Sequence, residues 1–144
     1  MIRHGWRALA SLALVATAAL LPASPASAVA DGFTVTARAA FLQVSGTTVT
    51  LAGRYTCGPF AGGVPDRGVV DVTLSQTVGG VETIAFGFLT PTVCDGRPQR
   101  YAVDLTAVNG TFQHGRARWS ASGYVEGSTG LQSVFVPPTR INIR

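Results

Sequence analysis

Two cysteines, Cys57 and Cys94, carry the most defined chemistry in this sequence. Such a pair can form a disulfide, act as a reactive thiol or supply two metal ligands. A metal site would need a second pair of Cys or His ligands, and His114 is the only histidine after the first 28 residues. We therefore expect the disulfide, which stabilises a fold by about 4 kcal/mol at this loop length if chain entropy dominates.

Groups suited to catalysis are sparse. His114 follows an Asn-Gly pair in a stretch that indicates a turn, where a histidine is more often a solvated side chain than a general base. Serines are plentiful, but no Gly-x-Ser-x-Gly elbow occurs. Asp66 and Asp95 lie in turn-forming contexts, whereas Asp71 and Asp104 occupy outward strand positions. A calcium site built from these four stays an alternative without a loop signature. We expect no active site and no cofactor.

The sequence favours a binding surface over an active site. The longest irregular stretch, residues 58–68, carries Phe60 among small residues, and loops at the ends of a rigid scaffold commonly carry recognition. Arg116, Arg118 and Tyr124 form an outward row on one predicted strand, which is suited to an anionic wall polymer or an acidic protein. In the alternative interpretation, Phe60 points inward and the row is an ordinary solvated face.

The first 28 residues predict export. Arg3 and Arg7 precede an apolar run at residues 8–21, too short to span a membrane, and an Ala-x-Ala site follows. We expect cleavage after Ala28, with Ala30 as the alternative, and secretion of one domain at residues 29–144 with no further membrane span. Export delivers the domain to an oxidising compartment, in which a disulfide persists.

The charge of the exported part is small. It holds nine arginines against seven acidic residues, a formal net charge of +2, and the chain contains no lysine. That balance, and the lack of a basic stripe interleaved with aromatic residues, predicts no nucleic-acid partner. The bias toward Ala, Val, Gly and Arg is typical of a GC-rich genome.

Period-two alternation of apolar and polar residues indicates seven strands and no helix after the signal. The segments are 33–41, 48–57, 70–75, 84–88, 101–107, 116–123 and 134–143. In the last segment Pro137 and Pro138 cannot donate to a ladder, so we expect a bent strand at a sheet edge.

The hairpin around Gly79 and Gly80 allows two registers. A two-residue turn would place Ile84, Phe86 and Phe88 on the polar face of the preceding strand, residues 70–75. A three-residue bulged loop at residues 78–80 pairs them instead with the apolar residues of that strand, Leu74, Val72 and Val70 in that order. We therefore predict the bulged loop.

Seven short strands in about 100 residues predict an all-β fold, an immunoglobulin-like sandwich of two antiparallel sheets with one disulfide. Four motifs resemble small secreted actinobacterial domains that are largely uncharacterised: Gly46-Thr47-Thr48-Val49-Thr50-Leu51, Tyr55-Thr56-Cys57, Cys94-Asp95-Gly96-Arg97-Pro98 and Gly115-Arg116-Ala117. The resemblance is structural and transfers no functional residue.

These observations indicate three candidate functions, in order of preference. The first is a secreted interaction module whose partner is a protein or a cell-wall component. The second is a protease inhibitor with an exposed loop. The third is a small hydrolase that uses His114.

Overall fold

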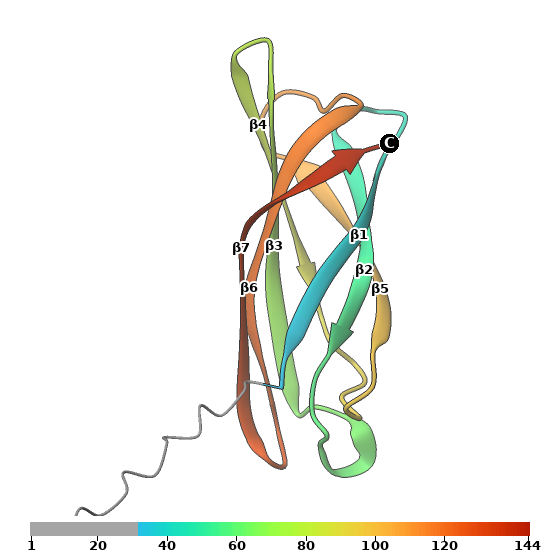
Figure 1. Ribbon diagram of the computed structural model, residues 1–144, viewed down its shortest axis with the longest axis vertical. Coiled ribbons are helices and arrows are strands. Elements are labelled where there is room, and N and C mark those ends of the chain that lie inside the picture. The colour runs from blue at the N-terminus through green and yellow to red at the C-terminus, as the bar shows by residue number, and fades with distance from the viewer. Residues whose placement is uncertain (1–31) are drawn as a thin grey trace, which may run out of the picture.

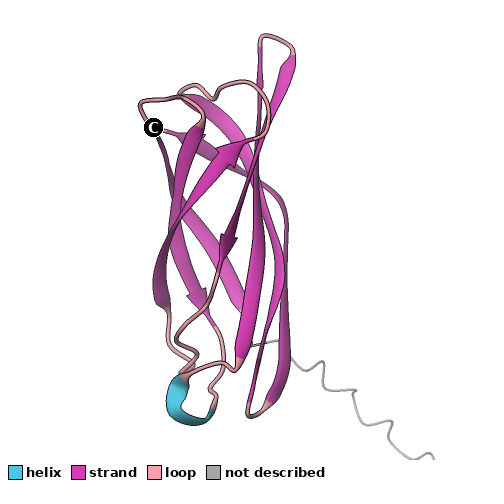
Figure 2. Cartoon of the chain, turned by 180° about the vertical axis from the view of Figure 1, so that it is seen from behind, coloured by secondary structure: helices cyan, strands magenta, loops and turns pink. Residues whose placement is uncertain are grey.

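The computed structural model describes residues 32–144, so the predicted signal segment and the cleavage sites at Ala28 and Ala30 lie outside the described residues. All seven predicted strands are present, together with one short 3-10 turn (Figure 1, Figure 2). The elements are β1 (Thr34–Leu42), β2 (Thr48–Thr56), η1 (Ala61–Gly63), β3 (Arg67–Val78), β4 (Val81–Leu89), β5 (Gln99–Ala107), β6 (Gly115–Gly127) and β7 (Gly130–Ile143). No helix within residues 32–144 is long and apolar enough to cross a membrane.

The predicted open two-sheet, immunoglobulin-like sandwich is wrong, because the strands close into one barrel. Their order is β1-β2-β5-β4-β3-β6-β7, with β7 returning to β1. Every neighbouring pair is antiparallel except β1 and β7, which are parallel and join through Ala40 and Ile143. The join between β4 and β5 is also short, with two residue pairs.

Two strand pairs of the barrel contain an irregular position. The register of β1 against β2 shifts between Ala37 and Ala39. The register of β6 against β7 shifts between Trp119 and Ala121, where the two prolines of β7 lie opposite. Bulges of this kind bend a strand and increase its twist. The last strand is therefore bent as predicted, but it does not end a sheet, because it crosses to β1 (Figure 1).

The barrel interior holds residues that the alternation predicts to face inward. The largest fully buried apolar side chains come from β2, β3, β5 and β6: Val49, Leu51, Val70, Val72, Leu74, Leu105 and Val125. The predicted disulfide is confirmed, with Cys57 directly after β2 and Cys94 ahead of β5. The backbone N–H of Gly96 donates to Cys57 O and that of Phe60 to Cys94 O, both at 2.9 Å, and these bonds fasten the same end of the barrel.

The predicted register of the β3–β4 hairpin is wrong. The turn has two residues, Gly79 and Gly80, both with positive φ, and Val78 pairs with Val81. Two left-handed residues give the turn whose twist matches that of the flanking strands, and glycine adopts this conformation without steric cost. The outer face of β4 therefore carries three large apolar side chains, Ile84, Phe86 and Phe88.

Close packing of β4 against β5 explains why these rings lie outside. A Cβ atom on Gly87 would lie 2.6 Å from Leu105 Cδ2 and 2.7 Å from the Asp104 carbonyl oxygen. Because the backbones approach so closely at this inner position of β4, a Phe side chain has no room there. Phe86 is 49% exposed and Phe88 is 66% exposed as a result.

Candidate binding surface

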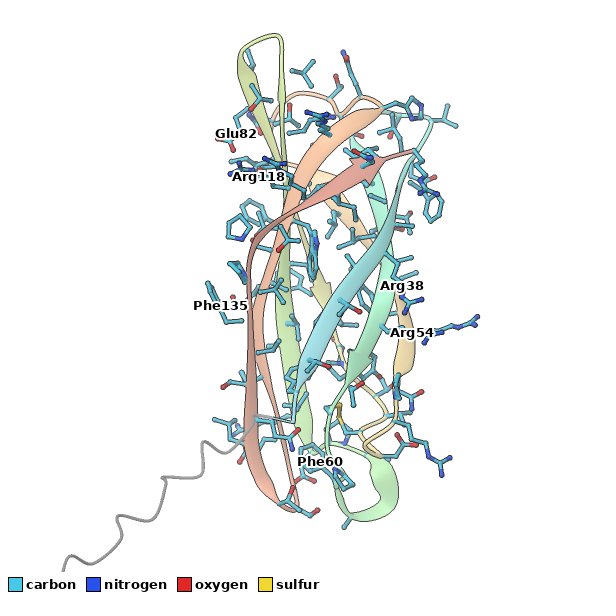
Figure 3. The ribbon with its side chains drawn as sticks, viewed as in Figure 1. Arg38, Arg54, Phe60, Glu82, Arg118 and Phe135 are labelled. Atoms are coloured by element: carbon cyan, nitrogen blue, oxygen red, sulfur yellow. A yellow bond between two sulfur atoms is a disulfide. The ribbon has the colours of Figure 1, made fainter. Side chains whose placement is uncertain are left out.

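The predicted binding residues do not form one site. Arg116, Arg118 and Tyr124 all lie on β6, but Tyr124 is six residues from Arg118, which corresponds to about 20 Å along a strand. Phe60 is 5% exposed and lies next to Gly127, where an added Cβ atom would lie 2.5 Å from the ring (Figure 3). The inward orientation is thus the one observed, and Phe60 is not on a surface.

The two predicted arginines of β6 belong to a larger group. Arg116 and Arg118 line an open hollow of about 420 Å³ together with Arg140 of β7 and Glu82 of β4. Ser75 and Thr77 of β3 also line this hollow. Three arginines thus face one shared space at this end of the barrel.

Two further hollows continue this surface around the barrel. The second, of about 430 Å³, shares Arg116 and Arg140 with the first and adds Arg38 of β1 and the C-terminal Arg144. The third, of about 300 Å³, shares Arg38 with the second. It adds two arginines from the next two strands of the barrel, Arg54 of β2 and Arg100 of β5.

We call six of these residues the arginine belt: Arg38, Arg54, Arg100, Arg116, Arg118 and Arg140. They come from β6, β7, β1, β2 and β5, which are consecutive neighbours in the barrel. In Figure 3, Arg118 lies at one side of the molecule, and Arg38 and Arg54 point outward at the other side. The belt therefore runs around the barrel from β6 to β5.

Like charges lie side by side in the belt. Arg54 pairs directly with Arg100 across β2 and β5, and Arg118 pairs directly with Arg140 across β6 and β7. Two like charges at such cross-strand positions destabilise a sheet. The register thus places two pairs of arginines side by side, and no ion pair within residues 32–144 neutralises them.

No belt arginine forms an ion pair within residues 32–144. The ion pair in this part of the chain joins Arg67 of β3 to Glu126 of β6, outside the belt. It raises the pKa of Arg67, through the side-chain hydrogen bond to Glu126 first and through the charge of that carboxylate second.

The acidic residues around the belt do not neutralise it. Glu82 lines the first hollow, but no ion pair joins it to an arginine of the described chain. Asp104 lies on β5, four positions after Arg100, and its carboxylate accepts a hydrogen bond of 2.6 Å from the Thr50 hydroxyl. Asp95 lies in the turn before β5, where the Arg97 backbone N–H donates to its Oδ1 at 2.9 Å. That hydrogen bond is the chief reason that the pKa of Asp95 is lowered.

The outer face of β4, β3, β6 and β7 has a different character. Two adjacent cross-strand rows cover it, each with phenylalanine at a margin and short polar side chains beside it. We call their seven residues the aromatic face: Phe88, Asp71, Ser122 and Phe135 in one row, and Phe86, Thr73 and Ser120 in the row nearer the belt. Phe135 is 76% exposed and points away from β7 (Figure 3).

The residues considered for catalysis are dispersed. His114 is exposed in the loop between β5 and β6. No group of three or more His, Cys, Asp or Glu side chains within residues 32–144 is placed to hold a metal ion. The calcium alternative built from the four aspartates therefore has no support in the described part of the chain.

Comparison of the chain with protein families, with curated proteins and with solved structures finds no match. The candidate site is therefore defined by geometry alone.

The sequence identified two of the six belt arginines. The outward positions of the other four are visible in the alternation, but their proximity depends on strand order and register. The sequence pattern leaves both of these open.

Proposed function

We propose that this chain is a secreted binding module that attaches to an anionic polymer outside the cell through the arginine belt. The single observation that carries the proposal is the alignment of six arginines over five neighbouring strands, with two directly opposed pairs. Guanidinium groups pair with carboxylate and phosphate in a bidentate geometry, so such a surface suits either anion.

A polymer fits this surface better than a small anion. The three hollows are open and joined by shared arginines, and a single exposed ion pair contributes only about 0–1 kcal/mol. Several weak contacts along one chain add up, because each later contact is intramolecular. The predicted signal and the disulfide favour a location outside the cell, where such polymers occur.

Single charge reversals test the proposal. Protein recovered from culture medium is titrated with fluorescent polyglutamate, with Arg118→Glu and Arg54→Glu as belt variants. Arg97→Glu is the matched control, because it changes the net charge equally at an exposed arginine outside the belt. We expect both belt variants to weaken binding at least fivefold and the control to change it little. Equal weakening by all three variants would reduce the effect to net charge and overturn the proposal.

A further inference from the structure

We propose that the polymer is an acidic polysaccharide, whose sugar rings lie on the aromatic face while its acid groups enter the arginine belt. This inference rests on the proposed function and deepens it. The hairpin register places two exposed aromatic side chains, Phe86 and Phe88 of β4, on the outer face of the barrel.

The aromatic face extends across four neighbouring strands. Phe88 and Phe135 are separated by three strand spacings, which corresponds to about 14 Å. Asp71 and Ser122 lie between them, and the adjacent row adds a threonine and a serine. Apolar surface is thus available at both margins and hydrogen-bonding groups in the centre.

Sugar rings have the complementary chemistry. One face of a pyranose presents C–H groups, which an aromatic ring attracts through its negatively charged face, and the ring edge carries hydroxyl groups. Ser and Thr side chains donate to or accept from such hydroxyls, and Asp accepts from them. An apolar protein partner would instead remove the central polar groups from water without replacing their hydrogen bonds, which carries a free-energy penalty.

The belt adjoins this face directly. The next row beyond Thr73 and Ser120 contains Ser75 and Arg118, with Arg140 opposite Arg118, about 7 Å along the strands. A glycan on the aromatic face therefore has its substituents within reach of the first hollow. Charge complementarity with Arg118 and Arg140 selects an acidic glycan over a neutral one, provided that its acid groups point toward the belt and away from Asp71.

Two polymers with the same acid group separate the sugar contribution from the charge contribution. Polygalacturonate carries a carboxylate on a sugar ring, whereas polyglutamate carries it on a peptide. The variants Phe86→Ala and Phe135→Ala remove exposed rings at the two margins, and Val44→Ala is a control for loss of exposed apolar surface in the β1–β2 loop. We expect each Phe variant to weaken polygalacturonate binding roughly fivefold to tenfold, with polyglutamate binding and the control unchanged.

Other results of these binding experiments would overturn the sugar proposal, the belt proposal or both. If both Phe variants bind polygalacturonate as tightly as the parent while Arg118→Glu weakens both polymers, the sugar proposal is wrong and the belt stands. If Arg118→Glu weakens neither polymer, the proposed function fails as well. A parent protein that dimerises, with Phe135→Ala monomeric, would overturn the sugar proposal and assign the face to a second copy. Loss of single-stranded DNA binding in the Phe variants, without loss of polygalacturonate binding, would overturn it in favour of nucleic acid.

Discussion

Salt dependence offers a quantitative test of the arginine belt. A polyanion releases condensed counterions when cationic side chains replace them, so the logarithm of the binding constant falls linearly with the logarithm of salt concentration. With the coefficient of a single nucleic-acid strand, about 0.7 per contact, six belt arginines give a slope of about −4. Raising salt from about 50 to about 200 mM then weakens polyglutamate binding about 300-fold.

Removal of one opposed pair of arginines should make that slope less steep by a defined amount. Arg118→Thr combined with Arg140→Thr leaves four belt arginines, for which the same coefficient gives a slope of about −3. Arg97→Thr should leave the slope of the parent. Fluorescence anisotropy over a series of salt concentrations measures all three proteins. A parent slope between zero and about −1 would show that most belt arginines do not contact the polymer, and an unchanged slope in the double variant would refute the assignment of that pair.

Three further predictions concern stability. Replacing Cys57 and Cys94 by Ser opens a loop with a sequence separation of 37 and should lower the free energy of unfolding by about 4 kcal/mol in urea titration, as reduction of the parent should. Gly87→Ala should cost about 1–3 kcal/mol, because its Cβ atom meets β5; a parent-like midpoint would contradict that packing. Burial raises the pKa of Tyr101 to about 12, so its contribution to stability is complete below the unfolded pKa of about 10 and is lost as pH rises toward 12. Between about pH 8 and about pH 11, the free energy of unfolding of Tyr101→Phe should therefore fall by about 1.4 kcal/mol less than that of the parent. Equal decreases in the two proteins would refute the raised pKa of Tyr101.

The strands and the disulfide could be predicted because they depend on local pattern. Alternation in β2 and β3 determines which side chains face inward whatever the neighbouring strand is, as the full burial of Leu51 and Val72 shows. Cys57 and Cys94 had one possible pairing. Neither conclusion needed strand order.

Local pattern gives conflicting signals for the hairpin register. Gly79 and Gly80 favour the two-residue turn, whereas burial of Phe86 and Phe88 favours the longer loop, and contacts with a third strand decide between them. Burying Phe86 and Phe88 satisfies β3 and β4 taken as a pair. The approach of β5 to Gly87 excludes them from the interior. The same limit applies to closure of the barrel, since the bend in β7 could be predicted but its meeting with Ala40 of β1 could not.

The second hollow spans the short pairing between β1 and β7, so a ligand bound in it would contact both sides of this pairing. Arg38 stands on one side of this join, and Arg116 and Arg140 stand on the other, so a polymer seated there would tie the two sides together. Separation of the first strand from the last would then require release of the polymer. Bound protein should accordingly resist pulling forces and proteolytic nicking at this junction better than free protein does.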